Sequence, residues 1–185
     1  MLLKRWQNKM EVFEKLLDPE LYAYFKNATF YENPVFHTAH KMVDFYIEFE
    51  NVIPLEIYEQ IITKLQLSLH AHVKLHMHTK NSVIEMDELD RYVNFFVEKY
   101  SDVKDFRFLH PYLENDTICF STRDESSLAA LNLALPSLME KLADVGITQE
   151  IVCKKVEDDI EIETAKVQVA APVVKQEPVK KQYPS

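Results

Sequence analysis

Glycine is almost missing from this sequence, which has a single glycine, Gly146, among its 185 residues. Phosphate-binding loops of the P-loop and dinucleotide types contain several glycines, because the backbone must approach the phosphate closely and adopt conformations that side chains oppose. One glycine cannot build either kind of loop. The composition therefore excludes most nucleotide-binding enzymes.

Cysteine and long apolar runs are also scarce. The two cysteines, Cys119 and Cys153, lie far apart in strand-like segments, where reduced and buried thiols are expected, and this predicts a cytoplasmic protein. No run of 18 uncharged apolar residues is present, so no membrane-spanning helix is expected. The first residues lack the uninterrupted apolar block and the cleavage site of a secretory signal.

Positive charge is in deficit as well. The formal net charge is −9 at pH 7, which disfavours a general binder of nucleic acid or anionic membranes, because phosphate binding needs clustered lysine and arginine. A local basic patch is still compatible with this charge. One alternative function is therefore weak nucleic-acid binding through basic residues of the second half, namely Lys104, Arg107, Lys154 and Lys155.

A strand–helix–strand pattern occupies the centre of the chain, from Val43 to His78. In the first strand every second residue is apolar, as in a strand with one buried face; these residues are Val43, Phe45, Ile47 and Phe49. Pro54 is expected at the first helical position, where its missing N–H is tolerated. An apolar stripe at helical spacing follows, with Ile61 beside it, and contains Leu55, Tyr58, Ile62, Leu65 and Leu69. The pattern predicts a small α+β core.

The preceding segments extend this core to a unit with the element order α-α-β-β-α-β. A helix is expected over residues 4–17. A second helix begins with Asp18 as its N-cap and Pro19 at its first helical position. The strand Thr29–Phe36 contains Pro34, which predicts either an edge strand or a bulge.

A second unit follows with the order α-β-β-α-α-β. An amphipathic helix is predicted over residues 86–100, and a short helix over residues 103–109. Asn115 and Asp116 are expected to form the turn of a β-hairpin.

The second unit ends with a helical pattern and a strand. The helical pattern from Asp124 to Val145 is interrupted by Pro136, so it forms either one kinked helix or two helices. Gly146 is expected to end it in the left-handed conformation. The final strand then lies within residues 148–156.

Together these elements predict an α+β protein with two small tandem domains and a tail. The expected boundaries are 1–80, 81–156 and 157–185, and the last segment, acidic and then rich in Pro, Val and Lys, is expected to be a disordered linker. The element order resembles that of type II KH domains, which are α/β sandwiches. Functional KH domains clamp nucleic acid with a GXXG loop, which neither unit has, so binding by that route is not expected.

The second strand of the central pattern carries a row of histidines, His70, His72, His76 and His78. Side chains two residues apart on a strand share a face at a spacing of about 6.6 Å, so two imidazoles could join a zinc or copper ion if a third ligand came from elsewhere. Lys74 within the row opposes a cation, and no cysteine or acidic residue lies close in sequence. The preferred interpretation is a polar, solvent-facing side of a strand, with a metal-binding protein as an alternative.

No set of residues predicts catalysis. Asp87, Glu88 and Asp90 fit the first turn of a helix, where acidic side chains favour the helix dipole, better than a magnesium site. Serines near His110 lack the glycines of a nucleophile elbow. We therefore expect no catalytic residue and no cofactor in this chain.

Two stretches of the chain resemble the N-terminal region of the PolC-type bacterial DNA polymerase III α subunit. They are KMVDFYIEFENVIPLEIYEQIITKL and ALPSLMEKLADVGI, which resemble a strand, a leucine–proline turn and two helices of that family. The likeness extends from Phe13 to Val156 in the same order. It departs where residues 41–43 replace a common Arg-Arg-Trp, and where Gly146 lacks an aromatic neighbour. These motifs are core residues, so they indicate homology and reveal little chemistry.

The resemblance implies two tandem non-catalytic domains, the first similar to the polymerase-binding C-terminal domain of the clamp-loader tau subunit. The parent protein would be a DNA-directed DNA polymerase with a 3′–5′ exonuclease, but its OB, PHP and polymerase domains are not found here. The chain is therefore expected to be a fragment or a truncated product. The implied role is protein–protein docking in the replisome during DNA replication. Replisome proteins, with the tau subunit as a candidate, are the expected partners, and DNA contact is expected to be weak.

Overall fold

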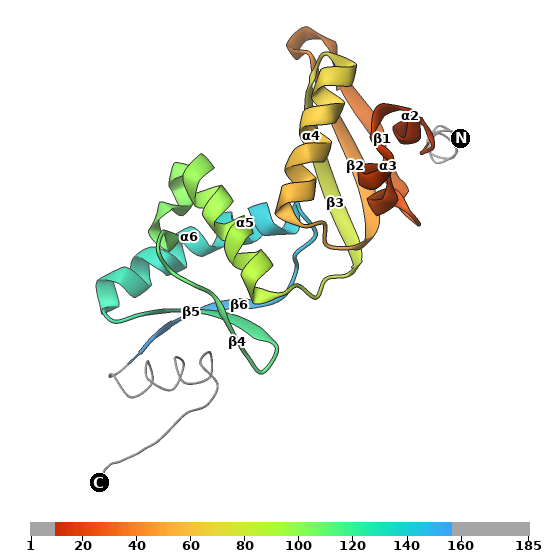
Figure 1. The fold of residues 1–185 in the computed structure, drawn as a ribbon. Helices are drawn as coiled ribbons and strands as arrows, with labels where there is room; N and C mark the ends of the chain where they lie inside the picture. Colours follow the sequence, from red (N-terminus) through yellow and green to blue (C-terminus); the bar gives the residue numbers. More distant parts are fainter. Residues whose placement is uncertain (1–9, 157–185) are drawn as a thin grey trace.

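The structure is a computed structural model that describes residues 10–156 and shows a mixed α+β protein (Figure 1). It contains two three-stranded sheets with helices packed against them, which confirms the predicted fold class at this level. The first sheet consists of β1 (Thr29–His37), β2 (Met42–Asn51) and β3 (His72–Asn81). The second consists of β4 (Tyr112–Glu114), β5 (Thr117–Thr122) and β6 (Ile151–Lys155).

Both sheets have the same topology. In each, the first two strands are antiparallel and the third pairs in parallel with the second. A parallel pair cannot be joined by a hairpin, and a helix makes the crossover in both cases. These crossover helices are α4 (Leu55–Leu69) and α6 (Glu125–Ala143). We call the elements from α2 to β3 the first unit and those from α5 to β6 the second unit.

The strands of the first unit follow the predicted alternation. Val43, Phe45, Ile47 and Phe49 of β2 are all buried, and so are Val73, Leu75 and Met77 of β3. The strand β1 is at the edge of the sheet, and its register shifts between Phe30 and Glu32 and again between Glu32 and Val35. The second shift spans Pro34, which has no N–H for the ladder, so the prediction of an irregular edge strand is confirmed.

The crossover helix α4 begins one residue later than predicted, because Pro54 is its N-cap and Leu55 its first residue. The centre of its buried face also differs from the prediction. Ile61 and Leu65 are 1% and 0% exposed, whereas the other members of the predicted stripe are only partly buried. Ile61 was predicted beside the stripe and in fact lies at its centre.

Two short helices precede the first sheet. They are α2 (Val12–Leu16) and α3 (Pro19–Tyr22), and a 3₁₀ turn, η1 (Ala23–Phe25), follows. The predicted helix over residues 4–17 is therefore shorter within the described residues, and residues 1–9 lie outside them. Asp18 is the N-cap of α3 and Pro19 its first residue, as predicted.

The second unit begins with α5 (Met86–Lys99), which confirms the predicted helix. The predicted short helix over residues 103–109 is instead the 3₁₀ helix η3 (Ser101–Phe106). The hairpin turn is confirmed, since Asn115 and Asp116 both have positive φ, 50° and 66°. That conformation is tolerated by Asn and Asp more than by most residues.

The helix α6 is one continuous helix that includes Pro136. Pro136 lies on the exposed side, while Leu131, Ala134, Leu138 and Leu142 pack into the core on the other side. Because buried residues both before and after Pro136 in the sequence pack into the core, their packing offsets the backbone hydrogen bond that the proline cannot make. Asp124 caps the helix by accepting a hydrogen bond from the Ser127 N–H.

The buried apolar residues form one cluster that runs through both units. The helix α5 lies next to the start of α4, where the Tyr92 hydroxyl donates to the carbonyl of Ile53 and the Leu55 N–H donates to the Glu88 carboxylate. The predicted domain boundaries remain a prediction, as the core continues across the expected border near residue 80. The predicted linker 157–185 lies outside the described residues.

No helix within residues 10–156 is long and apolar enough to cross a membrane.

Candidate functional site at the junction of the two units

The first sheet has a polar face opposite its buried face. Strand alternation places Asp44 and Tyr46 of β2 on this face, together with His76 and His78 of β3. Asp44 is nevertheless only 8% exposed, the one buried polar or charged residue among those described. A buried carboxylate needs partners, and these partners define the site.

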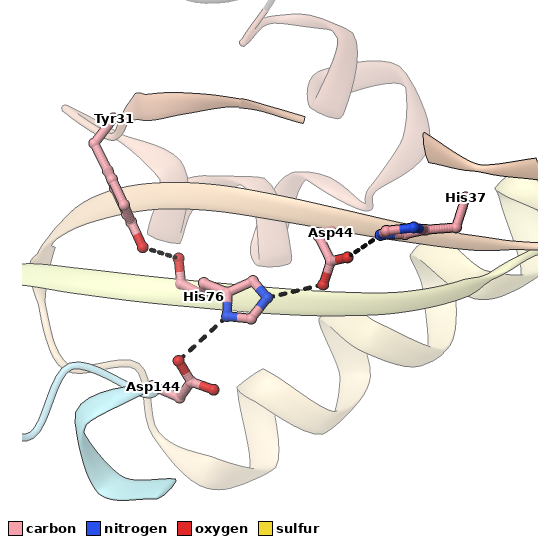
Figure 2. Close-up of polar contacts among 5 residues, drawn as sticks. All are labelled: Tyr31, His37, Asp44, His76 and Asp144. Carbon is pink, nitrogen blue, oxygen red and sulfur yellow. Dashed lines mark hydrogen bonds and ion pairs between the residues drawn. The ribbon is translucent and has the colours of Figure 1, made fainter. Parts of the chain in front are cut away.

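Asp44 lies between two histidines (Figure 2). Its Oδ2 is 2.7 Å from Nε2 of His37 on β1, and its Oδ1 is 2.8 Å from Nε2 of His76 on β3. Burial opposes ionisation, but the hydrogen bonds from His76 and His37 outweigh it and hold the pKa of Asp44 below its ordinary value. Asp44 is therefore a carboxylate that accepts from both rings.

His76 has a carboxylate at each ring nitrogen. Its Nε2 faces Asp44, and its Nδ1 is 3.2 Å from Oδ1 of Asp144, the residue that ends α6 (Figure 2). The hydrogen bond with Asp144 raises the pKa of His76, burial opposes this, and the bond with Asp44 adds to the rise. Because a neutral imidazole has only one N–H, both bonds form only when the ring is protonated.

Two tyrosines hold the histidine rings in place. The Tyr46 ring stacks on His76 with centroids 4.6 Å apart, and the Tyr31 ring stacks on His78 at 3.7 Å. The Tyr31 hydroxyl also donates to the His76 carbonyl over 3.3 Å (Figure 2). Burial raises the pKa of Tyr31 to about 12, so this hydroxyl stays a donor at all physiological pH values.

The end of α6 lies against the outer edge of β3. The Met77 N–H donates to the Asp144 carbonyl over 2.9 Å, and Thr79 Oγ1 donates to the Gly146 carbonyl over 2.8 Å. Gly146 has φ +86°, as predicted, and a Cβ there would lie 2.5 Å from Cγ2 of Thr79. A glycine is therefore required by backbone conformation and by close packing together.

The structure separates the predicted histidine row. His70 is the C-cap of α4 with φ 51° and is not part of the strand, whereas His72, His76 and His78 are on β3. The solvent-facing interpretation fits His72 and His78, which are exposed, but is wrong for His76, whose side chain is 18% exposed. Sequence distance concealed its partners, because Asp144 is 68 residues away and only the tertiary fold brings it near.

The metal-binding alternative gains no support from this geometry. Within the described part of the chain, no group of three or more His, Cys, Asp or Glu side chains is arranged to hold a metal ion. His76 already has both ring nitrogens engaged with carboxylates as a donor, and a protonated ring has no lone pair for a metal.

Three of the four basic residues proposed for nucleic-acid contact face carboxylates. Arg107 is 3.7 Å from Glu98, and Lys155 is 3.1 Å from Glu125. Lys154 is paired with Glu114. Lys104 is exposed on η3. Carboxylate neighbours weaken the attraction of these cations for phosphate, so the geometry does not favour this patch.

Phe108 is an exposed aromatic residue that sequence patterns failed to identify. It lies beyond the end of η3 rather than in the predicted helix, with 84% of its surface exposed and φ 67°. The Arg107 guanidinium lies 5.9 Å from its ring centroid. Leu133 on α6 is equally exposed, at 85%. No local sequence signal marks either residue, since both fall within patterns that predict helices.

Comparison with known families gave a match to the first unit. Residues 10–79 match the family described as DNA polymerase III polC-type N-terminus I. The comparison with curated proteins found no match. The matched segment spans the first unit from α2 into β3, the part that contains Asp44 and His76. This match confirms, over residues 10–79, the resemblance seen in the sequence to the N-terminal region of the PolC-type DNA polymerase III.

Proposed function

We propose that this chain is the non-catalytic N-terminal region of a PolC-type replicative DNA polymerase III α subunit and serves as a protein-docking module in the replisome. The observation that carries the proposal is the family match over residues 10–79. The role belongs to bacterial DNA replication, and the chemistry of polymerisation is assigned to other parts of the parent enzyme. The clamp-loader tau subunit is the first partner to test.

The same proposal includes a finer fold assignment. Each unit is assigned to a KH-like class without the GXXG loop, and the first unit is assigned a likeness to the polymerase-binding domain of tau. Support comes from the shared strand order of the two sheets and from their shared mix of antiparallel and parallel pairs.

We assign the docking surface to the second unit, with Phe108 as its central anchor. An exposed phenylalanine in the left-handed region is unfavourable by about 1–2 kcal/mol, since the side chain crowds the backbone there. Backbone strain of this kind is concentrated at functional sites. Aromatic residues and arginine are also the side chains that most often dominate binding energy at interfaces, and Arg107 lies beside the ring.

The experiment is a titration of the whole chain with purified tau subunit, compared with the variant Phe108→Asn. Asparagine tolerates positive φ, so the variant should be at least as stable as the wild type. We expect the variant to bind more weakly by a factor of about 30, the loss typical of a central interface anchor. Leu67→Ala is the matched control, because Leu67 is an exposed apolar residue of α4 at 68% exposure.

The possible results distinguish the docking role from the assignment of the docking surface to Phe108. A wild-type chain that binds neither tau nor any other purified replisome protein would remove the docking role. Equal binding by the wild type and by Phe108→Asn would leave the role and reject the surface. Retention of the wild type on a DNA column at low salt, with a steep loss on adding salt, would favour the nucleic-acid alternative through Lys104, Arg107, Lys154 and Lys155 instead.

A further inference from the structure

His76 is a side chain that reaches both units at once. It belongs to β3 of the first unit, holds Asp44 of β2 through Nε2, and holds Asp144 at the end of α6 through Nδ1 (Figure 2). The Asp44, His76 and Asp144 side chains are 12%, 18% and 45% exposed. The contact therefore has an inner, well-shielded half within the first sheet and an outer half that joins the second unit.

The charge around His76 favours a protonated ring. Asp44 and Asp144 bond to the ring. The charged and titratable groups of the neighbouring elements are Tyr31, Glu32 and His37 from β1, Asp44, Tyr46 and Glu48 from β2, Lys74 and His78 from β3, and Asp144 from the end of α6. Four of these are carboxylates and only one is a lysine. The ring also lies at the C-terminal end of a 19-residue helix, where the helix dipole favours a cation.

Other contacts between the units do not depend on this proton. The Thr79 hydroxyl bonds to the Gly146 carbonyl, two residues beyond Asp144. On the α5 side, Tyr92 bonds to the carbonyl of Ile53. The units would therefore stay joined when His76 loses its proton, and only the end of α6 would be held less firmly.

We propose that His76 is a protonation-dependent latch between the units: the imidazolium fixes Asp144 against the first sheet, and deprotonation releases the end of α6 from it. When the ring becomes neutral it keeps one N–H, and the shielded Asp44 retains this donor because it is the closer and less exposed partner. Asp144 then faces a lone pair instead of an N–H. A repulsive contact replaces an attractive one at the outer half of the network.

The pKa shifts of His76 and Asp44 set the pH range in which the latch is closed. The pKa of His76 is raised above 6.5, so its contribution is complete below that value and is lost as pH rises through the folded-state pKa. The pKa of Asp44 is lowered below 3.8, so its contribution is present above that value and is lost only as pH falls through the lower folded-state pKa. The latch is closed at pH 6.5 and opens as pH rises through the raised folded-state pKa of His76.

The test measures the protonation of His76 and the protection of the Met77 amide in the same sample of the whole chain. NMR of labelled histidine gives the pKa of His76, and amide hydrogen exchange gives the protection factor of Met77, whose N–H bonds to the Asp144 carbonyl. We expect the His76 pKa to lie above 6.5 and the Met77 protection to fall about tenfold as pH rises through it, the size expected of one hydrogen bond to a charged group.

Two variants separate a latch from a merely structural histidine. In Asp144→Asn the amide oxygen can still accept a hydrogen bond, but the charge is gone, so the His76 pKa and the exchange transition should both move to lower pH. His72→Gln removes an exposed histidine of the same strand and should leave both unchanged. A His76 that titrates at or below 6.5 in the wild type, or an Asp144→Asn transition at the wild-type pH, would overturn the proposal.

Discussion

In the first unit the strands are 9, 10 and 10 residues long, whereas those of the second unit have 3, 6 and 5 residues. Alternation along β2 and β3 gives the first sheet one buried face and one polar face, and the polar face carries the network around Asp44. The second sheet has few ladder bonds, and its core depends on α5, η3 and α6, as in the contact between Phe106 and Phe120 at 5.0 Å. Units with one topology can thus be held by backbone pairing or by helix packing.

The contrast between the two units assumes that they unfold together. Tyr92→Ala tests this assumption, and of the variants described it is expected to lower the free energy of unfolding the most. Tyr92 is fully buried on α5 and bonds to Ile53 of the first unit. We expect a loss of about 3–5 kcal/mol in the free energy of unfolding, the range for removing a buried large aromatic side chain. Because the core is continuous, denaturation followed by two optical probes should give one shared transition. Two separate transitions would contradict the continuous core.

The next largest effect is expected from Gly146→Ala, which acts on the edge where the units meet. The new Cβ would clash with Cγ2 of Thr79, and φ +86° is unfavourable for alanine, so we expect a loss of about 2–3 kcal/mol. Thr79→Ser removes the clashing methyl group and keeps the hydroxyl that bonds to Gly146. The double variant should recover the steric part of the loss, measured by a double-mutant cycle in denaturant. If the effects of the two substitutions on the free energy of unfolding simply added, a steric clash between them would be excluded.

Asp44→Asn tests whether charge stabilises the polar face of the first unit. We expect a loss of about 1–2 kcal/mol, because hydrogen bonds to a charged group become neutral ones. The deficit should be present above pH 3.8 and vanish in stronger acid, where the wild-type carboxyl is itself protonated. It should also shrink as pH rises past the raised pKa of His76. Thermal unfolding across this pH range checks the prediction, and a deficit independent of pH would exclude a charge effect.

The smallest effect is expected on the second unit, from Lys154→Ala. Lys154 pairs with Glu114, but both side chains are about half exposed, and exposed ion pairs are screened by water. The midpoint of denaturation should match that of the wild type. A clear loss would show that ion pairs across β4 and β6 hold the short sheet together, and would weaken the contrast with the first unit.

Much of the fold could be predicted because it depends on local patterns. The alternation of Val43 to Phe49, the helix of residues 86–100 and the turn at Asn115–Asp116 each follow from side-chain periodicity or from backbone preferences within a few residues. Some local predictions were wrong. In place of the short helix over 103–109 the chain forms the 3₁₀ helix η3, which ends at Phe106, and Phe108 lies in a turn with positive φ that its apolar character did not predict.

The candidate site was almost invisible to the same reasoning. The sequence presented His76 as one of four similar histidines, and the strand pattern gave each an equal expectation of facing solvent. Its role depends on which strands pair and on where α6 ends, and neither is encoded by neighbours in the chain. The parallel pairing of β2 with β3 supplies Asp44, and the end of α6 supplies Asp144.

By itself the sequence determined most of the element types, the α+β class, the family resemblance and the left-handed conformation of Gly146, since each of these depends on short-range sterics, burial patterns or motif identity. Only the tertiary structure decided that the core is continuous, that Phe108 is exposed and that His76 lies between two carboxylates. The physical reason is that burial and charge pairing are properties of segments brought together by folding, and residues 44, 76 and 144 have no periodic relation in the chain.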